Sequence, residues 1–132
     1  MLSAEQIINY QASSDCLKDR IIFITGAGDG IGKAAALACA QAGATVILAG
    51  RTVAKLEQVY DQISDAGLAE PNIYPINFEG AIADDYDVLA VTLDQQFGRL
   101  DGLLHNAGIL GQRTPLSHYR QDVWDKVLQV NL

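Results

Sequence analysis

Hydrophobic and polar residues alternate along the chain in blocks that predict strands and helices in turn. Short runs rich in Val, Ile and Leu, bounded by glycines, are typical of buried parallel strands. Between them lie longer segments whose apolar residues recur three and four positions apart, the spacing of an amphipathic helix. The pattern predicts strands over 20–26, 44–50, 72–78 and 101–108, and helices over 30–42, 52–66, 84–97 and from about Gln121 onward.

This order of elements predicts an α/β fold, a doubly wound parallel sheet with helices on both faces. Pro75 lies within the third predicted strand and indicates that this strand is at the edge of the sheet, because proline cannot donate a ladder hydrogen bond. Residues 1–19 fall outside the alternation. They predict an N-terminal leader that either packs on the surface or stays mobile.

Composition and charge narrow the classes of partner. The chain has 132 residues, of which 49% are hydrophobic, enough for one domain with a hydrophobic core. Its net charge of −7 argues against nucleic acid as a partner, since phosphate backbones require basic surfaces. The apolar segment 34–50 contains Gln41 and Gly43 and is shorter than the ~20 residues of a membrane span, so we interpret it as a helix followed by a strand.

The N-terminal residues and the two cysteines predict a cytoplasmic protein without a metal site. The first residues, "MLSAEQIINY", lack the basic start and the continuous apolar stretch of a signal peptide. Cys16 and Cys39 have no metal-binding or disulfide spacing, so we expect both to be reduced thiols.

A glycine pattern opens the first predicted helix. Residues 25–32 read "TGAGDGIG" and fit TGxxxGxG, with a tight turn at Gly26, close approach of a phosphate at Gly30 and close helix–sheet packing at Gly32. The free N–H groups of the helix start and its dipole would bind an anion. We expect the side chain of Asp29 to point away from such a ligand and to complement the positive end of the helix.

Three motifs in order, "TGAGDGIG", "HNAG" at 105–108 and "VNL" at 130–132, resemble the short-chain dehydrogenase/reductase family. The resemblance implies a Rossmann-type sheet that binds NAD(H) or NADP(H). It also implies hydride transfer between the nicotinamide and a small-molecule alcohol or carbonyl substrate.

The resemblance also implies roles for individual residues. Asn131 matches the family asparagine that holds a water in the proton relay, and is the predicted catalytic residue. His105 replaces an asparagine of the family motif, and either a cofactor-side role or a packed, hydrogen-bonded structural role is open to it, the latter being preferred. The predicted cofactor-binding residues are Gly26, Asp29, Gly30, Ile31, Gly32, Arg51, Asn77, Phe78, Asn106, Ala107 and Gly108.

Residues after the second predicted strand favour NADP over NAD. An acid at this position would bind the ribose hydroxyls of NAD, but the sequence reads "LAGRT" and has no acid before Glu57. Arg51 instead offers a permanently charged planar group suited to the oxygens of a 2′-phosphate. After the third strand, Asn77 stands where the family has an aspartate near adenine, and can still accept a hydrogen bond.

The remaining catalytic residues implied by the resemblance are not in the chain. The family uses Tyr and Lys in a Tyr-x-x-x-Lys spacing, and none of the five tyrosines has a lysine four residues later. We therefore expect the 132 residues to be the N-terminal, cofactor-binding portion of a longer enzyme, with residues 20–132 a Rossmann domain truncated before the catalytic region. The segment 102–108, "GLLHNAG", would then be an exposed apolar edge that favours association, so we also expect a homo-oligomer.

Two alternatives remain open. The chain could be a non-catalytic dinucleotide-binding module that functions as it stands. A methyltransferase also has a glycine-rich first turn but ranks last, because the acid expected at the end of the second strand is missing.

Overall fold

The computed structural model describes residues 3–132, the side chain of Ile7 excepted, and is built around a four-stranded parallel sheet. The strand order is β3-β2-β1-β4, so the chain runs outward from β1 to β3 and then crosses to the other side of β1. Phe23 of β1 lies level with Ile47 of β2 and Leu103 of β4. The strands are β1 (Ile21–Thr25), β2 (Thr45–Gly50), β3 (Asn72–Pro75) and β4 (Gly102–Leu104).

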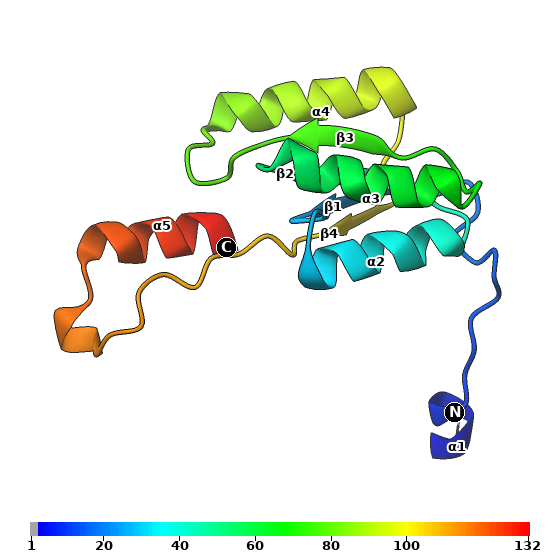
Figure 1. Cartoon of the computed structure of the whole chain (residues 1–132), viewed down its shortest axis with the longest axis horizontal. Helices are drawn as coiled ribbons and strands as arrows, with labels where there is room; N and C mark the ends of the chain where they lie inside the picture. Colours follow the sequence, from blue (N-terminus) through cyan, green and yellow to red (C-terminus); the bar gives the residue numbers. More distant parts are fainter. Residues whose placement is uncertain (1–2) are drawn as a thin grey trace.

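Helices connect the strands and cover both faces of the sheet (Figure 1). Helices α2 and α3 pack against one face, and α4 packs against the other. The segment that carries α1 and the segment that carries α5 both extend away from the sheet (Figure 1). The helices are α1 (Ala4–Ile8), α2 (Gly30–Gln41), α3 (Val53–Asp65), α4 (Ala83–Phe97), the 3-10 turn η1 (Leu116–His118) and α5 (Gln121–Asn131).

The face under α2 and α3 is fully packed. Small residues of α2, Ala36 and Ala40, let this helix approach the sheet closely, while larger side chains of α3 fill the remaining space. The large side chains of this core that are at most 1% exposed are Ile24, Val46, Leu48, Leu56, Val59 and Ile63.

The face under α4 is less complete. Phe23, Ile47 and Ala49 form its buried part, and Leu89 and Leu93 of α4 pack against them while remaining partly exposed. No residue of α4 is buried, and Leu103 of β4 is 50% exposed. The two faces of the sheet are therefore unequally covered in the part of the chain that the structure describes.

The structure confirms the predicted fold class and corrects two strand ends. The third strand lies at an edge, as Pro75 indicated, but ends at that residue rather than at 78. The fourth ends at Leu104 rather than at 108, because the amides of Asn106 and Ala107 donate to the Thr25 hydroxyl instead of continuing a ladder. The interpretation of 34–50 as a helix and a strand is also confirmed.

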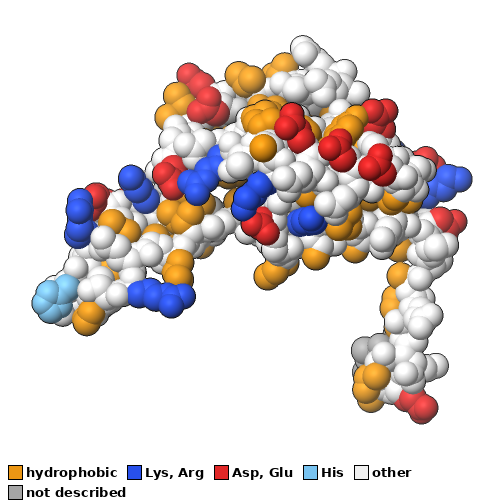
Figure 2. All heavy atoms as spheres, viewed as in Figure 1, with side chains coloured by type: hydrophobic (Ala, Val, Ile, Leu, Met, Phe, Trp, Pro, Cys, Tyr) orange, Lys and Arg blue, Asp and Glu red, His pale blue; other side chains and the backbone are white. Residues whose placement is uncertain are grey.

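Surface charges of both signs are mixed on the face shown in Figure 2, with apolar side chains between them. Across residues 3–132, none of the helices has the length and apolarity needed to traverse a bilayer.

Asp101 ties the start of β4 to the start of β1. Its carboxylate accepts the Ile21 N–H at 2.9 Å and pairs with Arg20 at 3.1 Å and with Arg99. The Arg99 hydrogen bond, followed by the Ile21 N–H, holds the pKa of Asp101 well below its usual range.

We predict that this carboxylate makes stability depend on acid pH. Because its folded pKa lies below the unfolded value of about 4, its contribution is complete above that value and is lost as the pH falls toward the folded pKa. Asp101→Asn should therefore lower the urea midpoint at neutral pH, and the difference from wild type should shrink in acid. Asp87→Asn, an exposed carboxylate with no ion pair among the described residues, is the control. A wild-type-to-variant difference that is the same at both pH values would contradict the prediction.

Candidate functional site

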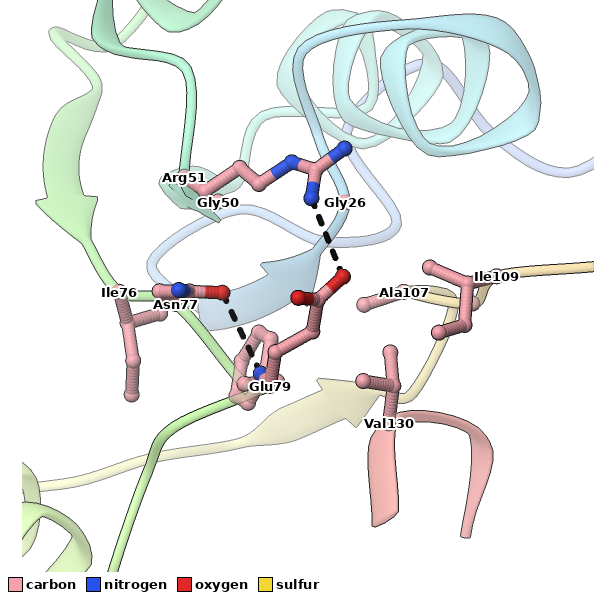
Figure 3. A pocket seen from close by; sticks show the side chains of 11 residues that line it. Gly26, Gly50, Arg51, Ile76, Asn77, Glu79, Ala107, Ile109 and Val130 are labelled. Atoms are coloured by element: carbon pink, nitrogen blue, oxygen red, sulfur yellow. Dashed lines mark hydrogen bonds and ion pairs between the residues drawn. The ribbon is translucent and has the colours of Figure 1, made fainter. Parts of the chain in front are cut away.

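A groove lies at the carboxyl ends of β1 and β2, beside the point where the chain crosses to β4. Open α/β sheets bind ligands at such a switch point. A cavity of about 140 Å³ and a second of about 350 Å³ both border on Gly26, Gly50, Arg51 and Gly108, so the two form one continuous groove. Figure 3 shows the smaller cavity, which Glu79 and Arg51 enter from opposite sides.

The turn from β1 into α2 forms one wall of the groove. Gly26 and Gly30 have φ of +66° and +51°, a region that glycine reaches without steric cost. Among the described residues, none accepts a hydrogen bond from the N–H groups of Ile31 or Gly32. Added to the dipole of α2, these amides form a site suited to a phosphate, and a Cβ built on Gly30 would meet no atom within 4 Å.

Asp29 caps this helix rather than entering the anion site. Its carboxylate accepts the Gly30 N–H at 2.8 Å and pairs with Lys55 of α3 at 2.5 Å. The Lys55 hydrogen bond, then the Gly30 N–H, lowers the pKa of Asp29. The expected role of Asp29 at the positive helix end is confirmed. Sequence reasoning missed Lys55, although its place in the first turn after Arg51 puts it at the same sheet edge.

Arg51 follows β2 and is paired across the groove. Its Nη1 lies 3.3 Å from Glu79 Oε1, and 63% of its side chain is exposed (Figure 3). The side chain of Asn77 accepts the Glu79 N–H at 3.2 Å, which uses one of the two lone pairs of its carbonyl oxygen. Sequence reasoning named Arg51 and Asn77 but missed Glu79, which neither a motif nor a strand end marks.

Thr25 joins the loop after β4 to the end of β1. Its hydroxyl accepts the N–H groups of Asn106 and Ala107, both at 2.9 Å, and donates to the Leu104 carbonyl. The Asn106 side chain donates in turn to the carbonyls of Thr25 and Gly26, at 3.0 and 3.3 Å. Asn106 therefore braces the groove from behind instead of lining it.

Asn131, at the end of α5, contacts the same loop. Its side chain donates to the Ile109 carbonyl at 3.0 Å and accepts the Ile109 N–H at 2.8 Å. One N–H and one lone pair of the amide remain free for a further partner.

Next to the groove, an apolar cavity of about 370 Å³ lies between β4, α4 and the end of α5. Its wall includes Asn131, Leu103 and His105, and Phe78 borders both this cavity and the groove. His105 is exposed and takes part in none of the side-chain hydrogen bonds among the described residues, so the preferred prediction of a packed, hydrogen-bonded structural histidine is wrong. β4 ends at Leu104, just before His105, whereas the predicted strand ran to 108, so the ring lies at the cavity wall instead of inside the sheet.

The predicted site residues therefore gather around one groove, with two exceptions. Asn106 supports it from behind, and Asn131 lies at the apolar cavity. In residues 3–132, no group of three His, Cys, Asp or Glu side chains is placed to hold a metal ion. The smaller cavity is lined by Gly26, Arg51, Asn77, Phe78, Ala107 and Gly108, the larger by Asp29, and the adjoining helix start is formed by Gly30, Ile31 and Gly32.

Comparison with known proteins identifies the family. A model of the short chain dehydrogenases matches residues 20–132. The chain belongs to the short-chain dehydrogenase family. It is 42% identical over 125 residues to the uncharacterized oxidoreductase YciK of Escherichia coli K12, which is 95% of this chain and 50% of YciK.

Solved structures of the family superpose closely. A protein of Pseudomonas syringae assigned to the short-chain dehydrogenases gives a TM-score of 0.90 at 49% identity, over 94% of this chain and 51% of that one. A protein of Escherichia coli CFT073 with the same assignment, solved in complex with NADPH, gives 0.87 at 43% identity, over 92% of this chain and 50% of that one. The 132-residue chain thus spans about half the length of these relatives.

We predict that Gly32 tolerates no side chain, because a Cβ there would collide with the Gly26 carbonyl and lie 2.5 Å from Asn106 Nδ2. Alanine within a helix normally adds stability, but this overpacking should instead cost about 1–3 kcal/mol of unfolding free energy. Urea unfolding of Gly32→Ala checks this. Gly80→Ala, where a Cβ meets nothing within 4 Å, is the control and should change stability far less. A Gly32→Ala variant as stable as wild type would show that the turn is not closely packed.

Proposed function

We propose that this chain is the cofactor-binding part of an NADP(H)-dependent oxidoreductase that acts on an alcohol or carbonyl substrate. The observation that carries the proposal is a groove lined by the Arg51 guanidinium and adjoined by the helix-start amides of Ile31 and Gly32, which have no acceptor among the described residues. This arrangement suits a dinucleotide whose pyrophosphate binds at α2 and whose adenosine extends toward β3. The NADPH complex of the Escherichia coli relative, and a Shigella flexneri relative that is 42% identical and was solved with NADP, support this choice.

The residues at hand fit such a cofactor. Ile31 and Gly32 would bind its phosphates through their N–H groups, and Arg51 would bind the 2′-phosphate. Asn77 would contact the adenine. When bound, the nicotinamide supplies or accepts the hydride.

Asn131 would act from the other side of the loop. Its pair of bonds to Ile109 fixes the side chain, and the remaining N–H and lone pair are free to hold a water for proton transfer. We propose this as a positioning role in the proton relay.

A non-catalytic dinucleotide-binding module is the second candidate, since the same groove would hold a dinucleotide whether or not a reaction follows. Both candidates require NADP(H) binding, and they differ in whether the protein reduces a carbonyl compound with NADPH. We further propose residues 20–132 as the cofactor domain, 1–19 as a leader, and the cytoplasm as the location.

Cofactor titration tests the proposal. Wild type should bind NADPH more tightly than NADH, and Arg51→Ala should lose about 1.5–3 kcal/mol of NADPH binding, the worth of a hydrogen bond to a charged group. NADH binding should change little, because NADH lacks the 2′-phosphate. Isothermal titration calorimetry measures both affinities.

The matched control is Arg113→Ala, an exposed arginine outside the groove, which should bind NADPH as wild type does. Equal affinity of wild type for the two cofactors would overturn the assignment of NADP(H).

We also propose that the chain self-associates through the exposed β4 edge. Leu103 and Leu104 are 50% and 37% exposed on a strand with an open side, a surface that favours pairing with another copy. Leu103→Glu should reduce the weight-average mass in sedimentation. Ile8→Glu, an equally large change at an exposed residue of α1, should not. A wild-type chain that sediments as a monomer would contradict the proposal.

A further inference from the structure

The groove contains a carboxylate on the cation that the cofactor would need. Glu79 Oε1 lies 3.3 Å from Arg51 Nη1, and Figure 3 shows the two side chains meeting inside the cavity rather than outside it. From this juxtaposition we infer that Glu79 is a specificity-determining residue, which competes with a 2′-phosphate for Arg51 and weakens the preference for phosphorylated adenosine. The inference rests on the proposed function and concerns the same site.

The main chain places Glu79 in the groove independently of Arg51. After β3 ends, the Asn77 side chain accepts the Glu79 N–H and the Asn77 carbonyl accepts the Gly80 N–H at 3.2 Å. These bonds hold the turn whatever the Glu79 side chain does. The carboxylate itself has Arg51 as its only partner among the described residues. The backbone of Glu79 is therefore fixed, while its carboxylate can leave Arg51 without disturbing the turn.

Charge in the groove is balanced before any ligand binds. Arg51 is paired with Glu79, and Lys55 is paired with Asp29. The two pairs differ in what holds the carboxylate, because the Asp29 carboxylate also caps α2 whereas the Glu79 carboxylate has no second hydrogen bond within residues 3–132. Of the two carboxylates, that of Glu79 is therefore the easier one for a phosphate to displace from its cation.

A 2′-phosphate at Arg51 would lie close to the Glu79 carboxylate. Two negative charges about 4 Å apart repel even in a fully aqueous environment, enough to weaken binding about fivefold, and a dianion doubles the repulsion energy. The Glu79 side chain is 33% exposed against 63% for Arg51, so water shields it less than its partner. The loss of the Arg51–Glu79 pair on binding adds to this repulsion. A ligand without the 2′-phosphate incurs neither cost.

Adenosine 2′,5′-bisphosphate and adenosine 5′-monophosphate separate this effect from the rest of the cofactor site, since they differ only in the 2′-phosphate. By calorimetry, Glu79→Gln should bind the bisphosphate about tenfold more tightly than wild type, the change expected for removing one nearby like charge. The monophosphate should change by less than about twofold. The gain for the bisphosphate should shrink as salt is raised.

Glu57→Gln is the matched control. It removes the same charge from an exposed position of α3 that lines neither part of the groove, and should leave both affinities unchanged. Glu79→Ala should act in the same direction as Glu79→Gln, so a folding defect in one variant does not prevent the test.

The outcomes separate the inference from the proposed function. If wild type binds the bisphosphate and both Glu79 variants bind it as tightly as wild type or more weakly, Glu79 does not compete for Arg51, and only the inference is overturned. If both ligands gain equally, the effect is not specific to the 2′-phosphate, and the inference is again overturned. If no variant binds the bisphosphate, the proposed function and the inference are both overturned.

Discussion

The Thr25 hydroxyl is the contact on which the geometry of the groove depends. Thr25 is the only buried polar side chain among residues 3–132. Its hydroxyl accepts two N–H groups from the loop after β4 and donates to the carbonyl of Leu104, the last residue of β4. Because Gly26 follows directly, the same contact fixes where the chain turns toward α2. The helix start and the loop 105–108 are thereby held in one arrangement, although they are about eighty residues apart in sequence.

Electrostatic pairing then sets what the groove can bind. The chain carries a net charge of −7, which by itself disfavours a phosphate ligand. Local groups offset this net negative charge. They are the Ile31 and Gly32 N–H groups at the start of α2, and the Arg51 and Lys55 side chains near the carboxyl ends of the strands. Since both cations are already paired with carboxylates, the groove does not present a strongly positive surface. Binding there exchanges one anion for another, and specificity depends on the difference between the two.

Much of this arrangement could be predicted from sequence, but the pairings could not. The strand–helix alternation fixed the sheet and its two faces, and Gly26, Gly30 and Gly32 marked the turn because each position excludes or strains a side chain. Glu79 and Lys55 belong to no motif, and their partners are 28 and 26 residues away in the chain. Which charges meet depends on how strand ends align. The prediction for His105 was wrong for a related reason, since the strand was expected to continue to 108 but ends at Leu104, which leaves the ring beyond the sheet.

The unequal packing of the two sheet faces divides the site by rigidity. The amides that would bind the pyrophosphate belong to α2, which packs on the closed core beneath α2 and α3. Asn131 and the loop it contacts lie beside the apolar cavity, where Leu103 is half exposed and α5 has no buried residue. Local opening costs least where few apolar contacts are made. Pyrophosphate binding would therefore rest on the stable face, while the position of Asn131 depends on contacts made on the open one. Substitutions near β4 should therefore disturb the geometry around Asn131 more than they weaken phosphate binding at α2.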